Sequence, residues 1–226
     1  MEIVHTKYMN KRILIISSHP DDESICSGGL IMKAKKEGDK VYVLFMATGD
    51  SRQFMNGETK QSTRIDEIKK AAKFGNFEYS IGFYEKSTIV DTLPQKALIE
   101  TIEDYTKIVK PDLVVIPNRK SFNQDHRAVA EACLTAFRPI PKSLHPQPKI
   151  ILEMEEPYLW EGFRPNFYVE ISDIEERMQL YKCHTTQVPN PPHPRSIENL
   201  TRLAGMRGNE ISTQYAEGYN LIKEQI

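Results

Sequence analysis

The sequence is poor in cysteine, has a single tryptophan and contains no long apolar run. Its three cysteines, Cys26, Cys133 and Cys183, form no CxxC pair and are too few for a disulfide framework. Residues 1–12 lack the apolar stretch of a signal peptide, and no later segment is apolar for long enough to span a bilayer. We therefore expect a cytoplasmic protein without a membrane span.

An excess of charge of one sign is also missing. The 226 residues include 30 Lys and Arg against 31 Asp and Glu, and the two signs are interspersed. Because a nucleic-acid or anionic-membrane surface needs a basic patch, we expect no nucleic-acid partner. The chain is long enough to enclose one core, and no flexible linker divides it. We expect one domain over residues 1–226, and a homo-oligomer is compatible with the sequence.

Short β-branched blocks alternate along the chain with segments of helical spacing. The pattern predicts buried strands at residues 12–18, 40–48, 79–84 and 112–117, and more polar strands at 149–155 and 166–172. It predicts helices at residues 24–37, 62–75, 94–110 and 125–137, with a further helix opened by residues 172–173. Such alternation implies a Rossmann-like α/β fold with a mostly parallel sheet. The two polar strands are expected toward one edge of that sheet.

Two other segments carry weaker signals. Residues 188–194 contain four prolines, so they form neither a helix nor a central strand and are interpreted as a rim or lid loop. Gly28 and Gly29 follow the first strand, but a GxGxxG pattern is missing and the acidic turn before them would repel a pyrophosphate, which excludes a nucleotide cofactor. Cys183 and His184 are adjacent, point to different sides of a helix and make a poor chelate.

Side chains that can carry chemistry follow two of the predicted strands. The first strand runs into His19, which opens the sequence HPDDE, and the strand ending at Pro117 is followed by residues 121–126, which end in Asp125 and His126. Ligand sites of such sheets lie beyond the carboxyl ends of the strands. Imidazoles and carboxylates together suit a catalytic zinc with an open position. The alternative is an acidic surface turn that caps a helix in the first segment, with a capping aspartate and a surface histidine in the second.

With these two segments the sequence resembles the PIG-L/LmbE family of zinc-dependent N-deacetylases, which includes GlcNAc deacetylases of thiol-cofactor and glycolipid-anchor biosynthesis. The resemblance covers most of the chain. It implies that His19, Asp22 and His126 bind the zinc ion and that Asp21 is the general base. It also implies that Asp125 orients or tunes a neighbouring catalytic group. Fe²⁺ is an alternative to Zn²⁺ at a site of histidine and carboxylate ligands.

The second family motif, HxDH, has one departure in this sequence. It reads Asn123-Gln124-Asp125-His126, so an asparagine stands where the motif begins with histidine. We expect Asn123 to donate a neutral hydrogen bond to the developing oxyanion. The alternative is that Asn123 forms an Asx-type turn that positions His126.

A third likeness concerns the helix predicted at residues 62–75. Arg64, Glu67 and the alanine pair that begins at Ala71 resemble the family's RxxExxxAA helix. By that match Arg64 contacts a sugar hydroxyl or positions the substrate, while Asp50 and Arg52 line the rim of the site. The alternative is that Arg64 is an i,i+3 partner of Glu67 on a solvated face.

The resemblance implies an activity and a substrate class. The expected partner is a small N-acetylated sugar conjugate of the N-acetylglucosamine type, from which hydrolysis releases acetate. Asp21 would take a proton from water and return it to the departing amine. The alternatives are an amidase acting on a thiol conjugate or an antibiotic precursor, and a metal-containing binding module without turnover. Asn123 favours the binding module, whereas the intact HPDDE opposes it.

Overall fold

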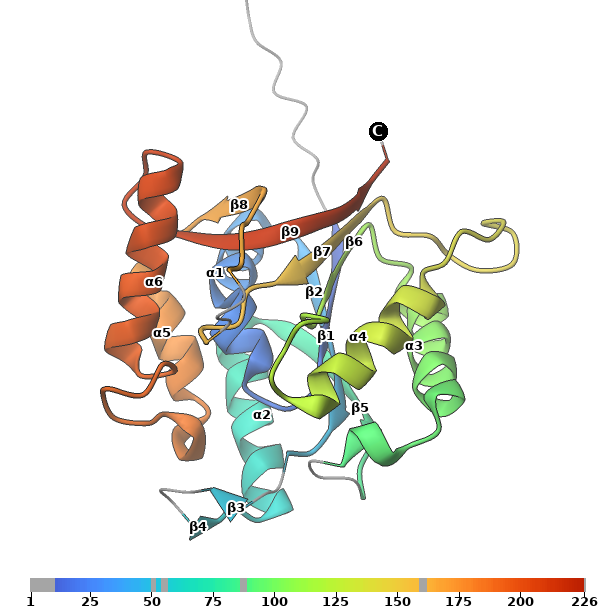
Figure 1. Ribbon diagram of the computed structural model, residues 1–226, viewed down its shortest axis with the longest axis horizontal. Coiled ribbons are helices and arrows are strands. Elements are labelled where there is room, and N and C mark those ends of the chain that lie inside the picture. The colour runs from blue at the N-terminus through green and yellow to red at the C-terminus, as the bar shows by residue number, and fades with distance from the viewer. Residues whose placement is uncertain (1–10, 50–51, 54–56, 86–88, 159–161, 226) are drawn as a thin grey trace, which may run out of the picture.

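A seven-stranded sheet with helices on both faces forms the core of the protein (Figure 1). The computed structural model describes residues 11–49, 52–53, 57–85, 89–158 and 162–225. The strands of the sheet, in spatial order, are β5 (Phe77–Phe83), β2 (Lys40–Ala47), β1 (Arg12–Ser17), β6 (Leu113–Ile116), β7 (Ile150–Met154), β9 (Ala216–Glu224) and β8 (Phe167–Glu170). A short antiparallel pair, β3 (Arg52–Gln53) and β4 (Gly57–Glu58), lies apart from it.

The helices divide between the two faces of the sheet. One face packs against α1 (Asp22–Glu37), α2 (Gln61–Gly75), α5 (Ile174–Lys182) and α6 (Ile197–Glu210). The other face packs against α3 (Gln95–Val109) and α4 (Gln124–Ala136). Two single-turn helices, η1 (Val90–Thr92) and η2 (Thr185–Gln187), lie in connections. No helix of the described part of the chain is long and apolar enough to cross a membrane.

The central strands are buried on both sides, as their β-branched sequences predict. In β1, Ile13 and Ile15 enter the core under α1, whereas Leu14 and Ile16 enter the core under α3 and α4. β1 pairs in parallel with β2 and with β6. The predicted α/β fold with a mostly parallel sheet is confirmed, and the carboxyl ends of β1 and β6 lie next to each other.

The two more polar strands, β7 and β8, lie toward one edge of the sheet as predicted, but a strand that the sequence pattern does not predict lies between them. β9 is antiparallel to both β7 and β8, and β8 is the edge strand. The sequence pattern predicts no strand at residues 216–224, because Gly218 and Asn220 interrupt it and both residue types are depleted in strands. Backbone pairing with a neighbour on each side overrides this weak local preference.

Glu217 of β9 anchors that strand to the middle of α1. The helix is interrupted at Ser27, and the carboxylate of Glu217 accepts the backbone N–H groups of Gly29 and Leu30 at 2.7 and 2.9 Å. It also accepts a hydrogen bond from Nε of Arg177 at 2.9 Å. Only glycine allows this close approach, because a Cβ on Gly29 would lie 2.9 Å from the carboxyl carbon. The C-terminal strand is thereby fixed to the helix that begins at the first motif.

We expect Glu217→Gln to lower the free energy of unfolding by about 3–5 kcal/mol, because Arg177 would keep a buried charge without its carboxylate. Urea unfolding measures this change. As a control, Glu37→Gln removes an exposed partner of Lys33 and should cost less than about 1 kcal/mol. Equal small losses in both variants would contradict the anchoring role.

Candidate active site

The turn after β1 is built around Asp21. Its backbone is left-handed, with φ 119°, and it occupies the N-cap position of α1. The backbone N–H of His19 donates to Oδ2 of Asp22 at 2.9 Å, which closes the turn. Because all three side chains are buried, the HPDDE segment is not the solvated acidic turn that the sequence left open.

His126 of α4 joins His19 and Asp22 in one group. A ligand atom of each lies within 4.8 Å of the others, and the two imidazole centroids are 5.3 Å apart. The adjacency of β1 and β6 explains this meeting, since the two motifs follow neighbouring parallel strands. The structure therefore brings together the three side chains that the resemblance assigns to the metal.

One ring nitrogen of each imidazole is hydrogen-bonded to a carboxylate. Nε2 of His19 donates to Asp125 at 2.8 Å, and Nδ1 of His126 donates to Glu156 at 2.9 Å. These bonds fix the ring orientations, as the carboxylate partners of metal-binding histidines do. Burial opposes the charged form of His126, but Asp22 and Glu156 outweigh it and raise the pKa of His126 to about 9.

The same contacts test whether a metal ion suits the group. Each imidazole keeps its second ring nitrogen for an ion, and a buried carboxylate, Asp22, supplies negative charge. Against the effect of burial, hydrogen bonds from His19 and from the backbone of Asp91 lower the pKa of Asp125, so this partner carboxylate is ionised. Two oriented imidazoles and a carboxylate fit a divalent cation. Glu156 was not predicted, and its only sequence signal is its place beyond the end of β7.

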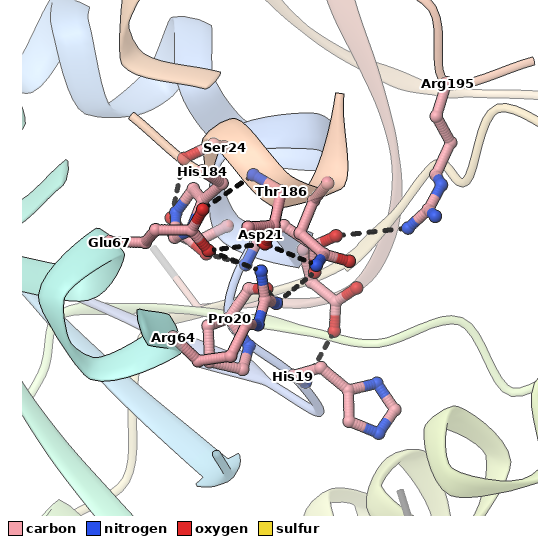
Figure 2. Close-up of polar contacts among 12 residues, drawn as sticks. His19, Pro20, Asp21, Ser24, Arg64, Glu67, His184, Thr186 and Arg195 are labelled. Carbon is pink, nitrogen blue, oxygen red and sulfur yellow. Dashed lines mark hydrogen bonds and ion pairs between the residues drawn. The ribbon is translucent and has the colours of Figure 1, made fainter. Parts of the chain in front are cut away.

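Asp21 lies beside this group, between two arginines (Figure 2). Its Oδ2 is 3.1 Å from Nη1 of Arg195, and its Oδ1 is 3.6 Å from Nη2 of Arg64. Burial raises the pKa of Asp21, whereas the two arginines oppose that rise. A raised pKa makes a carboxylate a stronger base, which favours proton uptake from a neighbouring donor.

Arg64 lies beneath the turn, buried between α2 and the HPDDE segment. Its side chain is 1% exposed, donates to the carbonyl of Pro20 and reaches Oε2 of Glu67 at 2.9 Å. The pairing with Glu67 is present, but on a buried face, because α2 packs its first turns against the HPDDE segment. The substrate contact of Arg64 stays a prediction. Asp50 lies outside the described residues, and for Arg52 only the backbone of β3 is described.

Asn123 caps α4. Its Oδ1 accepts the backbone N–H of Asp125 at 2.9 Å, and its own N–H donates to Oγ of Ser121 at 3.1 Å. This is the Asx-type arrangement that the sequence left open as an alternative. The cap uses the amide oxygen, so the amide nitrogen is not engaged by it. The oxyanion role of Asn123 stays a prediction.

A buried network that sequence reasoning missed supports the turn from the other side (Figure 2). Nε2 of His184 donates to Oε1 of Glu23 at 2.6 Å, and Oε2 of Glu23 accepts the backbone N–H of Asp21 at 3.0 Å. The backbone N–H of Thr186 donates to Oε1 of Glu67 at 2.6 Å. His184 is unsuited to a chelate with its neighbour, but its role is to hold a carboxylate 161 positions away in sequence.

Comparison with known proteins identifies the family. The chain matches the PIG-L family, described as GlcNAc-PI de-N-acetylase, over residues 14–137. This match includes both motifs and more than half of the chain. The chain belongs to the PIG-L family. The predicted family and the predicted enzyme class, a hydrolytic N-deacetylase, are confirmed.

This PIG-L family member is similar to individual known proteins over nearly its whole length. Diacetylchitobiose deacetylase of Thermococcus kodakarensis is 26% identical, over 94% of this chain and 83% of that protein. The structure of N,N'-diacetylchitobiose deacetylase from Pyrococcus horikoshii superposes with a TM-score of 0.76 and 21% identity, covering 94% of this chain and 84% of that one. The 4-carboxy-2-hydroxymuconate hydratase GalB of Pseudomonas putida KT2440 also has a TM-score of 0.76, at 18% identity and coverages of 96% and 98%. Because a hydratase has the same fold, the fold alone does not identify the reaction, which must be argued from the residues of the site.

The buried pair of His184 and Glu23 should make the stability of this PIG-L family member depend on pH. Burial disfavours the charged imidazole, but Glu23 outweighs it and raises the pKa of His184 above its usual 6.5. Burial likewise opposes the charged carboxylate, but His184 lowers the pKa of Glu23 below its usual 4.5. The raised histidine pKa stabilises the fold fully below its unfolded value, and this contribution is lost as the pH rises through the folded value.

We therefore expect the free energy of unfolding to fall as the pH rises above about 6.5, and to fall less in His184→Gln. Urea unfolding at several pH values between about 6 and about 9 measures both slopes. The control His193→Gln should leave the slope above about pH 6.5 nearly unchanged, because burial lowers the pKa of that histidine and its contribution changes only below its unfolded value. Identical pH dependence of wild type and His184→Gln would show that the pair is not charged in the fold.

Proposed function

We propose that this protein is a zinc-dependent hydrolase that removes the acetyl group from the nitrogen of an N-acetylglucosamine-type sugar conjugate. One observation supports the proposal: a buried carboxylate, that of Asp21, lies beside the group formed by His19, Asp22 and His126. The name of the family and the names of the two chitobiose deacetylases support an acetylated amino sugar as substrate.

His19, Asp22 and His126 would hold the ion. Two imidazoles and one carboxylate match the ligand set of catalytic zinc and leave a position open. When bound, zinc would supply Lewis acidity that lowers the pKa of water and stabilises negative charge on a carbonyl oxygen. Fe²⁺ accepts the same ligand types, so elemental analysis of the purified protein distinguishes the two metals.

Asp21 carries the proton through the reaction. Its carboxylate takes a proton from the attacking water as the water oxygen bonds to the carbonyl carbon. When the C–N bond breaks, Asp21 gives this proton to the nitrogen, which leaves as a free amine. The acyl group leaves as acetic acid, which then releases the second water proton to the amine or to solvent and becomes acetate. Because burial raises its pKa, one carboxylate can serve first as base and then as acid. Asp125 orients His19 during these steps.

A panel of amides tests the proposed substrate class. The zinc-loaded protein is incubated with N-acetylated sugars, nucleotide sugars and glycosides, and with amides of thiol conjugates, while free amine is assayed. Release from N-acetylglucosamine conjugates supports the proposal. Release only from thiol-conjugate amides would replace it by an amidase, and no release by fully loaded protein would favour a binding module.

Substitutions should separate proton transfer from metal binding. We expect Asp21→Asn to keep the metal and to lower kcat by about a hundredfold or more, the typical contribution of a general base. Asp22→Ala and His126→Ala should instead lose metal, because each removes a ligand. Elemental analysis and kcat are measured on the same samples. A metal-loaded Asp21→Asn protein with the wild-type rate would refute the proton-carrier role.

Substitutions of Asn123 distinguish two roles for this residue, a hydrogen-bond donor to the oxyanion and a helix cap. Asn123→Asp keeps an oxygen that can accept the N–H of Asp125 but removes the amide donor. If the amide binds the oxyanion, this variant should lower kcat by roughly tenfold to a thousandfold with metal retained. If Asn123 only caps the helix, Asn123→Asp should keep the rate. Asn123→Ala should then lose metal and activity together, and excess zinc should restore both.

A further inference from the structure

Arg195 approaches Asp21 from a different side than Arg64 does (Figure 2). It directly follows the proline-rich segment at residues 188–194, and its side chain is 22% exposed. Nη1 lies 3.1 Å from Oδ2 of Asp21. Arg64, on the other side of Asp21, is buried and donates to a backbone carbonyl and to Glu67. Arg195 is therefore the arginine of this pair that a bound molecule can reach.

The segment that carries Arg195 is held in place by the start of α6. Ser196 caps this helix by accepting the backbone N–H of Asn199. The side-chain amide of Asn199 donates to the carbonyls of Pro192 and His193 at 3.0 and 2.9 Å. The backbone N–H of Arg195 donates to Nδ1 of His193 at 3.1 Å. The guanidinium thus projects from a fixed backbone, which is the requirement for a preorganised charge.

The guanidinium has donors that the protein does not use. Nη1 donates to Asp21, and within the described part of the chain neither Nη2 nor Nε of Arg195 has a hydrogen-bond partner. A guanidinium carries five N–H donors in a planar fork and stays charged at all relevant pH values. The fork matches the paired oxygens of a carboxylate. An anionic oxygen next to Asp21 would find these donors already charged and partly desolvated.

We propose that Arg195 is a further substrate-contacting residue, whose unused N–H groups bind the acyl oxygen as it gains charge and then the carboxylate of the acetate product. This inference rests on the proposed function, which supplies the acyl substrate. As the water oxygen bonds to the carbonyl carbon, the C=O π electrons move onto the acyl oxygen that faces Arg195. They return when the C–N bond breaks, and the nitrogen keeps the electrons of that bond and takes the proton from Asp21.

Acetate binding tests this contact without any turnover. Sodium acetate is titrated into zinc-loaded wild type, Arg195→Met and Arg195→Lys, and affinity is measured by calorimetry, with metal content checked by elemental analysis. We expect Arg195→Met to bind acetate about tenfold to a hundredfold more weakly, the range for losing hydrogen bonds to a charged group. Arg195→Lys should be intermediate, because it keeps the charge but not the fork. It also serves as the informative variant if Arg195→Met does not fold.

Kinetics provide the second readout. We expect Arg195→Met to lower kcat by about a hundredfold, as for the loss of one oxyanion donor, with a smaller change in KM. The control Arg138→Met removes an exposed arginine paired with Glu103 and should change neither acetate affinity nor kcat. Unchanged acetate affinity in metal-loaded Arg195→Met would overturn the contact even if kcat fell, because Arg195 would then act only through Asp21. If no amide of the panel is hydrolysed but acetate affinity still depends on Arg195, the proposed function fails and the carboxylate contact stands.

Discussion

The left-handed backbone at Asp21 is the feature on which the site depends. For a residue other than glycine this conformation costs on the order of 1–3 kcal/mol. Buried contacts from both sides offset the cost, since Glu23 accepts the N–H of Asp21 and Arg64 donates to the carbonyl of Pro20. At this N-cap position the carboxylate of Asp21 makes no capping hydrogen bond and instead contacts Arg195 and Arg64.

The sheet determines what this turn can meet. Because β1 and β6 are parallel neighbours, the loops that follow them open at the same edge, and α4 begins there with His126. Carboxylates dominate this edge, and four of them are paired with a nitrogen-containing side chain: Asp125 with His19, Glu156 with His126, Glu23 with His184, and Asp21 with Arg195. Pairing keeps the acidic site compatible with burial, while the second nitrogens of His19 and His126 stay available to a cation.

Local sequence patterns predict the central strands and both motifs, because a buried parallel strand and the loop that follows it consist of consecutive residues. Contacts between distant segments could not be predicted in this way. Glu156, His184 and Arg195 reach their partners across 30, 161 and 174 positions, and no local sequence pattern identifies those partners. β9 was missed for a related reason, since its pairing with β7 and β8, not its propensity, makes it a strand.

The central claim is that His19, Asp22 and His126 form one metal site beside Asp21. Diffraction from crystals grown with zinc, recorded on both sides of the zinc absorption edge, tests this claim most directly. The account predicts one strong anomalous peak between the two imidazoles and the Asp22 carboxylate, and its absence from crystals of Asp22→Ala. A strong peak elsewhere, with none between these three side chains, would contradict it.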